Sequence, residues 1–377
     1  MLIERTILNS IYNSLHPGRV TLLYGPRQSG KTTLIKNILA KTSHSYLSLN
    51  GDEIHTQELL GKQDVNHLKS IVGGHKLLII DEAQRIPNIG LSLKLICDNI
   101  DIAVLASGSA SFDLANKVNE PLTGRGQTFF LYPLSWEELP KDKLVPEENY
   151  FEQTMRFGLY PKVATFSTEN EKQEYLSELI NTYLYKDILT FELVRKPKKI
   201  IDLLTLLALQ IGSEVSIAEL SSTLNISKVI VEKYLDLMEK MFIVVNLRGL
   251  SRNLRKEVTK TSKYYFLDLG IRNALIRNFN HLKVRQDQGS LWENFCIIER
   301  FKTISNTRQF ANFYFWRTYD QKEIDLIEER EGRLHAFEFK LSEKPIKRAV
   351  QKEFIKAYPN TQFNLITKNN FEDLQKL

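Results

Sequence analysis

The clearest chemical signal in the sequence is a glycine-bearing loop that begins at Gly25. Its residues match the phosphate-binding pattern G-x-x-x-x-G-K-[ST], with one more threonine after it; they are Gly25, Pro26, Arg27, Gln28, Ser29, Gly30, Lys31, Thr32 and Thr33. Glycines let successive backbone N–H groups curl around phosphate oxygens without a Cβ penalty. We expect Lys31 to reach the β- and γ-phosphates and the Thr32 hydroxyl to bind Mg²⁺. The sequence therefore predicts a nucleoside triphosphate site with Mg²⁺, and the alternative is a chance match in a turn.

A second signal is a pair of acidic residues, Asp81 and Glu82, directly after the apolar run Leu77–Ile80. Two adjacent carboxylates at the end of a buried strand are costly unless they meet a cation or water. We expect Asp81 to hold the Mg²⁺ shell and Glu82 to act as the base that positions the attacking water. The alternative is an ordinary exposed acidic turn.

Two further polar residues are candidates for the same site. Ser107 follows the next apolar run and is predicted to sense the γ-phosphate; Arg125 is predicted to stabilise transition-state charge in its own subunit or in a neighbour's. Small residues are common after strands, and Arg125 is equally compatible with a surface arginine. No Asn-Lys-x-Asp segment follows a strand, so ATP is favoured over GTP.

The elements that must position these residues alternate along the first part of the chain. Short apolar runs typical of strands lie at 19–25, 45–50, 76–82 and 101–109, and a helical pattern covers 31–42. Such alternation predicts an α/β fold with a parallel sheet covered on both faces. After Pro133 the chain becomes mostly helical, and from Asn312 to Lys340 the apolar period drops to two, which indicates antiparallel strands.

The middle of the chain shows three helical patterns at 199–210, 217–223 and 227–241, followed by two strand-like segments. This order predicts a winged helix-turn-helix. The predicted wing, residues 248–263, contains six basic side chains against one acidic one; they are Arg248, Arg252, Arg255, Lys256, Lys260 and Lys263. Such a wing suits the phosphates of double-stranded DNA. The alternative is a winged helix that serves packing or protein contacts.

The last strands carry a second group of charged residues. Asp325, Glu338 and Lys340 lie on strand-like segments at 322–329 and 334–341, and Glu293 lies on a helical segment upstream. Converging carboxylates predict a second Mg²⁺ site at which Lys340 orients or deprotonates a water that attacks a phosphodiester. Alternating charges are, however, also expected on any half-exposed strand.

Several segments together carry a family resemblance; they are GPRQSGKTTL, LLIIDEAQRIPN, ASGSAS, GRGQTFFLYPLSWEEL, FGLYPKV, YYFLDLGIRNAL and residues 289–340. The chain resembles a prokaryotic family of AAA-type ATPases with a C-terminal domain of originally unknown function. The resemblance implies an AAA-like fold in which Ser107 or Ser109 is a sensor and Arg125 a family-typical arginine. It also implies a winged-helix middle and a restriction-endonuclease-like end. There Asp325, Glu338 and Lys340 match the PD-(D/E)XK pattern, with Ile324 in place of its proline.

Length and composition bound the remaining expectations. The 377 residues suggest two or three domains, and we place boundaries to give 1–135 (ATPase), 136–198 (helical linker), 199–280 (winged helix) and 281–377 (nuclease-like). No apolar run approaches the ~20 residues of a membrane helix, and two distant cysteines indicate a reduced, cytoplasmic protein. The net charge of +6 is compatible with nucleic acid. Oligomeric state is left open.

These signals support two hypotheses. In the first, an ATPase couples hydrolysis to DNA binding, with metal-dependent DNA cleavage as an open extension. In the second, a nucleotide-gated signalling or assembly ATPase binds a protein partner through its C-terminal half and does not cut DNA.

Overall fold

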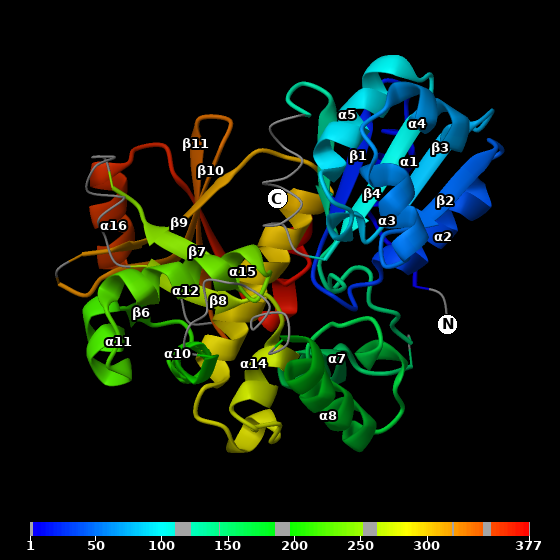
Figure 1. Ribbon diagram of the computed structural model, residues 1–377. Helices are drawn as coiled ribbons and strands as arrows, with labels where there is room; N and C mark the ends of the chain where they lie inside the picture. Colours follow the sequence, from blue (N-terminus) through cyan, green and yellow to red (C-terminus); the bar gives the residue numbers. More distant parts are fainter. Residues whose placement is uncertain are drawn as a thin grey trace. The chain divides into compact units, whose positions relative to one another are not determined.

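The computed structural model describes residues 3–109, 122–142, 144–184, 197–251, 262–318, 320–341 and 348–376. The chain divides into two compact units. The first comprises Met1–Leu134 with Lys240–Phe242, and the second comprises Ser135–Glu239 with Ile243–Leu377. Figure 1 shows both units, with labels on most of their helices and strands.

The first unit is built on a parallel sheet of five strands in the order β2-β3-β4-β1-β5. The strands are β1 (Val20–Tyr24), β2 (Tyr46–Asn50), β3 (Leu77–Asp81), β4 (Ala103–Gly108) and β5 (Gly126–Phe130). The helices are α1 (Leu8–Tyr12), α2 (Lys31–Lys41), α3 (Ile54–Gly61), α4 (Val65–Val72) and α5 (Ile89–Asn99), with a 3₁₀ turn η1 (Ala83–Arg85). This confirms the predicted α/β class.

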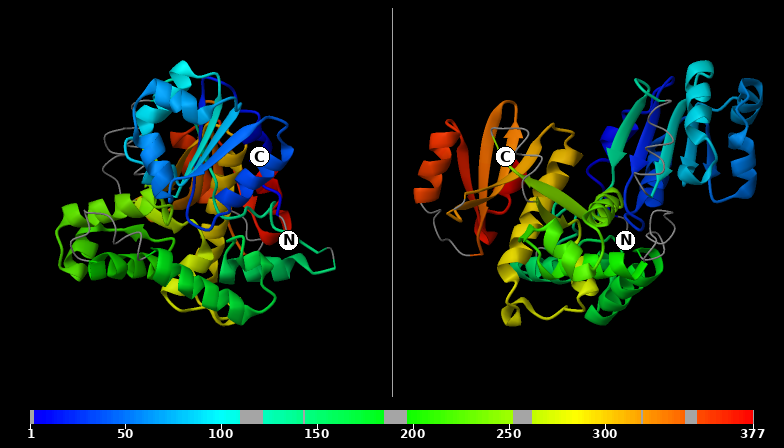
Figure 2. Two further views of the ribbon diagram at one scale, coloured as in Figure 1. Left: turned by 45° about the vertical axis from the view of Figure 1, so that its right-hand side comes forward. Right: turned by 60° about the vertical axis from the view of Figure 1, so that its left-hand side comes forward.

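Both faces of this sheet are buried, which is why its central strands are mostly apolar. Leu22 and Leu78 pack with α3, α4 and α5 on one face. Their chain neighbours Leu23 and Ile79 pack with α1 and α2 on the other. Figure 2 shows the helices on either side of the strands. Such double coverage requires uninterrupted apolar runs, because successive side chains of a strand point to opposite faces.

The second unit contains a mixed sheet of seven strands in the order β12-β11-β10-β9-β7-β8-β6. The strands are β6 (Glu214–Val215), β7 (Val244–Gly249), β8 (Ser262–Phe266), β9 (Asn312–Arg317), β10 (Glu323–Arg330), β11 (Arg333–Phe339) and β12 (Gln362–Ile366). The α-helices are α7 (Glu147–Phe157), α8 (Glu169–Glu178), α10 (Pro197–Leu209), α11 (Ile217–Leu224), α12 (Lys228–Lys240), α14 (Leu269–Leu275), α15 (Gln288–Asn306), α16 (Arg348–Ala357) and α17 (Asp373–Lys376). Short helical turns are η2 (Val163–Thr165), η3 (Leu179–Leu184), η4 (Leu282–Val284) and η5 (Lys368–Asn370).

The predicted elements of the second unit are present, and one connection among them was not foreseen. Helices α10, α11 and α12 precede the strands β7 and β8, and β9, β10 and β11 pair in antiparallel fashion. Strand β7 also pairs in parallel with β9, so one sheet runs from the middle of the chain into its last part. The predicted boundary at residue 280 therefore separates segments that share a sheet, and the division at 198 and 280 stays a prediction.

A buried carboxylate joins two of the segments that carried the family resemblance. Asp268 accepts hydrogen bonds from the backbone N–H of Leu159 (2.6 Å) and of Ile271 (3.2 Å). Burial raises the pKa of Asp268, and these backbone donors act against that rise. Gly158 lies against this carboxylate with a φ of +72°, and a Cβ there would lie 2.1 Å from Asp268 Oδ1. Residue 158 must therefore be glycine, because any side chain there would collide with the Asp268 carboxylate.

We predict that Gly158→Ala destabilises the protein by about 3 kcal/mol, because the new methyl group collides with Asp268 and the backbone is held at positive φ. Gly289→Ala is the matched control, since Gly289 lies in α15 and a Cβ added there would meet no atom of another element within 4 Å. Urea unfolding of both variants measures the difference. Equal midpoints for Gly158→Ala and the wild type would contradict this account.

Candidate active site

The predicted phosphate loop lies where the chain passes from β1 into α2. Gln28 (φ 64°) and Gly30 (φ 97°) take left-handed conformations that turn the loop. Gly30 is the N-cap of α2 and gives it no side-chain cap, so the first N–H groups of the helix are available to an anion. A Cβ on Gly25 would lie 2.1 Å from the Leu131 carbonyl oxygen, so this position accepts only glycine.

Lys31, the loop lysine, is buried, and its ammonium group is held by the loop itself. Its Nζ donates to the carbonyl oxygens of Gly25 (2.8 Å) and Pro26 (2.9 Å). The Ser29 hydroxyl is also buried, and it has no hydrogen-bond partner among the described residues. A buried cation and an unsatisfied hydroxyl in one loop fit a phosphate group, which would satisfy both.

The predicted Mg²⁺ residues meet directly. Thr32 Oγ1 donates to Asp81 Oδ2 at 2.8 Å, and Thr33 follows on the exposed side of the first turn. Asp81 Oδ1 accepts from the hydroxyl of Ser107 and from the backbone N–H of Glu82. A hydroxyl and a carboxylate at this spacing are oxygen ligands of the kind that Mg²⁺ takes. When bound there, Mg²⁺ would neutralise the charge of phosphate oxygens, so the residues present fit the ion.

Glu82 stands beside this pair in a left-handed conformation (φ 52°). Its Oε2 accepts from Gln84 Nε2 at 2.5 Å, and the same amide nitrogen donates to the Ser109 hydroxyl at 3.2 Å. Gln84 therefore ties the carboxylate of Glu82 to the end of β4. Gln84 was not predicted from the sequence, although an amide two residues after a carboxylate pair was a usable signal.

Arg5 supports the phosphate loop from outside the motif. Its Nη1 donates to the Ser29 carbonyl oxygen (2.8 Å) and its Nη2 to that of Tyr132 (2.7 Å). The side chain is buried, so these charge-assisted bonds are shielded from water. No sequence pattern marked Arg5, because it lies outside any recognisable spacing from the loop.

Arg125 lies at the edge of the sheet where β1 begins, and the phosphate loop lies at the opposite edge, where β1 ends. Its carbonyl oxygen accepts from the N–H of Val20, the first residue of β1, and its Nε contacts Asp98 Oδ1 at 2.5 Å. The phosphate loop follows the last residue of β1, and five residues of strand span roughly 16 Å. This placement argues against the predicted role in the same subunit, which stays a prediction. A role in a neighbouring subunit stays a prediction.

The second predicted constellation comes together at one end of β10 and β11. Lys340 Nζ contacts Glu338 Oε2 at 2.9 Å and Asp325 Oδ2 at 3.5 Å, and the Phe339 N–H donates to the same Asp325 oxygen at 2.8 Å. The pairing of β9 with β10 is irregular between Ile324 and Ile327, which is where Asp325 lies. Irregular pairing of this kind re-aims a side chain.

Glu293 belongs to this constellation but is already engaged. Its Oε1 accepts from Lys263 Nζ (3.2 Å) and from the Tyr265 hydroxyl (2.6 Å). Oxygens of Glu293, Glu323 and Asp325 all lie within 4.8 Å of one another. Lys263 also contacts Glu323, so a lysine ammonium sits against this carboxylate cluster. Glu323 and Lys263 were not predicted as members of the site.

The electrostatics of this cluster follow from burial and close charges. Burial, and then the charge of Asp325, raise the pKa of Glu293 to about 7. The same two causes raise the pKa of Glu338 to about 7. Burial tends to lower the pKa of Lys263, but Glu293 and Glu323 outweigh it and the pKa is raised. Lys263 therefore stays protonated beside these acids.

The placement of Lys263 corrects part of the predicted DNA-binding wing. Lys263 is only 1% exposed and faces the carboxylates, so it does not contact DNA from the surface. Arg248 is exposed, as the wing requires. The predicted contacts Arg252, Arg255, Lys256 and Lys260 lie outside the described residues.

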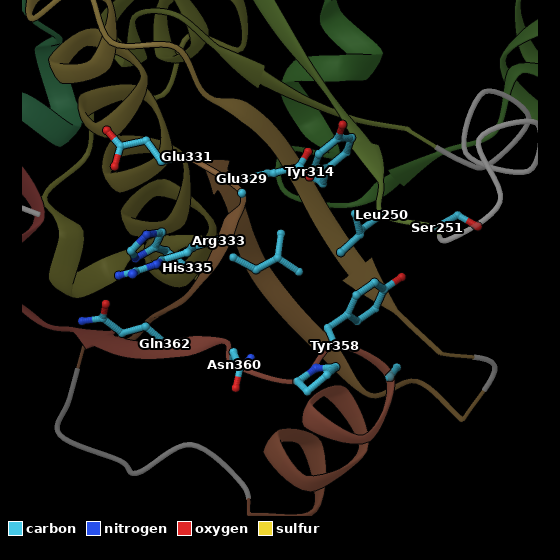
Figure 3. Close-up of a pocket in the computed structure, with 14 residues that line it drawn as sticks. Leu250, Ser251, Tyr314, Glu329, Glu331, Arg333, His335, Tyr358, Asn360 and Gln362 are labelled. Carbon is cyan, nitrogen blue, oxygen red and sulfur yellow. The ribbon is translucent and has the colours of Figure 1, made fainter.

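A wide pocket of about 920 Å³ lies at the opposite end of β10 and β11, around the turn at Gly332 (Figure 3). Tyr314, Arg333, His335 and Tyr358 contribute to its lining. None of the predicted site residues lines this pocket.

None of the described helices is long and apolar enough to cross a membrane.

Comparisons with known proteins agree with the assignment of the first unit. Residues 17–140 match the family model described as an AAA domain. Residues 148–282 and 288–375 match two models described as domains of unknown function (DUF8612 and DUF4143). The nuclease-like identity of the last part therefore stays a prediction, because the model that matches it carries no function.

Two similar proteins carry the description "uncharacterized protein". One from Mycobacterium tuberculosis is 28% identical over 353 residues, covering 92% of this chain and 76% of that protein. One from Methanocaldococcus jannaschii is 22% identical over 315 residues, covering 78% of this chain and 69% of that protein.

Among solved structures, the chain is similar to a Walker-type ATPase of Pyrococcus abyssi. The TM-score is 0.51 at 15% identity, over 72% of this chain and 93% of the other. This likeness shows a shared fold. The phosphate loop, the five-stranded parallel sheet and the family match over residues 17–140 agree with an AAA-type P-loop fold for this part of the chain.

Proposed function

We propose that this chain binds ATP with Mg²⁺ at residues 25–32 and hydrolyses it. The observation that carries the proposal is the hydrogen bond between Thr32 and Asp81, which brings a motif hydroxyl and a motif carboxylate together across 49 residues of sequence. We expect Glu82, the next residue of the chain, to lie beside the terminal phosphate. A chance loop match would not bring an acidic pair to the loop.

Each residue has a role that its contacts support. When ATP binds, the Lys31 ammonium group leaves the Gly25 and Pro26 carbonyl oxygens and donates to phosphate oxygens instead. Hydrogen bonds to the charged phosphate are stronger than those to neutral carbonyl groups. Glu82 accepts a hydrogen bond from the attacking water and orients it, and Gln84 holds the Glu82 carboxylate in place. Arg5 keeps the loop in position through the Ser29 carbonyl oxygen.

We predict that Glu82→Gln retains ATP binding but lowers kcat by about 10²- to 10⁴-fold, because the base that orients water is lost. Lys31→Ala is predicted to lose both binding and turnover. Steady-state phosphate release and calorimetric titration with ATP separate the two effects. Glu58→Gln and Lys36→Ala are matched controls, since both side chains are exposed on neighbouring helices. Hydrolysis by Glu82→Gln at the wild-type rate would refute the role of Glu82.

We further propose that the second unit binds double-stranded DNA through a winged helix-turn-helix. The order α10, β6, α11, α12, β7, β8 supports this proposal, as does the pairing of β6 and β7 with β8. At the start of α12 the Ser227 hydroxyl oxygen accepts from the N–H of Ile230 (3.4 Å). Helix α12 mixes Lys228 and Lys233 with Glu232 and Asp236, which favours phosphate contacts over base readout.

We predict that linear DNA stimulates ATP turnover and that stimulation weakens as salt rises, because phosphate binding releases counterions. Arg248→Ala should lower the slope of log affinity against log salt by about 1, the contribution of a single phosphate contact. Lys69→Ala, on the exposed surface of α4, is the control. Turnover that needs Lys31 and ignores DNA at low salt would favour the alternative, a signalling or assembly ATPase with a protein partner.

Metal-dependent DNA cleavage by Asp325, Glu338 and Lys340 is the remaining extension of this proposal. It requires the nearby carboxylates to accept a divalent cation. The contacts of Glu293 work against that requirement, because its Oε1 already accepts from Lys263 and Tyr265.

A further inference from the structure

The carboxylate cluster of Glu293, Glu323 and Asp325 has an unusual neighbour in Lys263. Lys263 is contributed by β8 and is 1% exposed, although lysine is rarely buried to this extent. Its Nζ lies 3.2 Å from Glu293 Oε1 and in closer contact with Glu323 Oε1. The centroid of the Phe315 ring lies 5.5 Å from the same Nζ. The ammonium group is therefore enclosed by two acids and an aromatic ring.

The position of Lys263 is set by the sheet rather than by a mobile surface loop. Lys263 is paired with Leu247 of β7 on one side and with Glu214 of β6 on the other. A backbone held on both sides directs the side chain to one place. Tyr265, two residues along β8 and on the same face, adds its hydroxyl to Glu293.

The charges of this region are close to balance without a further ion. Its acids are Glu293, Glu323, Asp325 and Glu338. Its bases are Lys263 and Lys340, with Arg317 Nε lying 3.4 Å from Glu323 Oε2. Carboxylates this close repel one another unless a nearby cation or a bound proton offsets their charge. Lys263 supplies that cation at Glu293 and Glu323, and Lys340 supplies it at Asp325 and Glu338.

A divalent ion on Glu293 and Glu323 would have to share its ligands with the ammonium group. Both cations would be held by the same two carboxylates, and two positive charges so close together in a buried site repel strongly. Of the residues predicted to hold the second Mg²⁺, Glu293 therefore does not fit the ion.

We propose that Lys263 is the resident cation of the Glu293–Glu323–Asp325 cluster and takes the place of a divalent metal ion there. The positive charge of Lys263 then offsets the repulsion between these carboxylates, so the cluster holds together without a metal ion. Its catalytic use as a metal-dependent nuclease is correspondingly blocked while Lys263 is in place. This inference does not depend on ATP hydrolysis by the first unit.

The test measures Mn²⁺ binding to the full chain by electron paramagnetic resonance, without nucleotide. All samples carry Asp81→Asn, which removes the carboxylate proposed for Mg²⁺ in the first unit. With Lys263 present, we expect no Mn²⁺ binding tighter than millimolar. Tighter binding that disappears on Asp325→Asn would overturn the proposal, and this arm needs no change at Lys263.

Replacing the lysine should open the site. In the same background, Lys263→Met keeps the apolar stem and removes the charge, and we expect Mn²⁺ to bind at least about tenfold more tightly. Adding Glu293→Gln should abolish the gain. We also expect the melting temperature of Lys263→Met to fall in EDTA and to recover with Mn²⁺. Lys283→Met, at an exposed position, should behave like the parent.

A folded Lys263→Met protein that gains no Mn²⁺ site would also overturn the proposal, because the lysine would then not occupy a cation position. If this variant does not fold, the titration of the parent chain and of Asp325→Asn still decides the question.

Discussion

Parallel pairing of β1, β3 and β4 is the constraint on which the nucleotide site depends. In a parallel sheet the carboxyl ends of all strands meet at one edge, so the loop after β1, the acids at the end of β3 and the serine at the end of β4 become neighbours. The contact of Asp81 with both Thr32 and Ser107 is the direct result. Helices on both faces make this arrangement stable, because they bury the apolar side chains of the central strands. The same rule places Arg125 away from the phosphate loop of its own subunit, because Arg125 precedes β5 and so lies at the amino edge of the sheet.

A different constraint governs the second unit, where charged side chains are buried in a mixed sheet. Glu293, Asp325 and Glu338 come from a helix and two strands, and their mutual repulsion must be offset inside the protein. Lys263 and Lys340 provide the opposing charge. This balance explains how a group of acids resembling a nuclease centre is held together by the chain alone. The sequence pattern predicts that these acids converge, but convergence alone does not make them available to a metal ion.

Local sequence patterns predicted the elements well, and they failed where tertiary placement decides the outcome. The apolar runs of β1, β3 and β4 and the spacing of the phosphate loop are local features, so their positions were predicted within a residue or two. Lys263 was grouped with a basic surface segment because nothing nearby in sequence shows that Glu293 and Glu323 will enclose it. Arg5 was missed for the same reason, since its partners are backbone carbonyl groups. The parallel pairing of β7 with β9 likewise joins segments more than sixty residues apart.

The central claim, an ATP site formed by the phosphate loop and the Asp81–Glu82 pair, is tested most directly by a crystal structure of Glu82→Gln with Mg²⁺ and ATP. The account predicts that the β- and γ-phosphates lie within hydrogen-bond distance of the N–H groups at the start of α2. It also predicts that Lys31 has left the Gly25 and Pro26 carbonyl oxygens for the phosphates, and that Mg²⁺ contacts the Thr32 hydroxyl. A nucleotide bound elsewhere, or a loop that stays empty with Lys31 still on those carbonyl oxygens at saturating ATP, would contradict it.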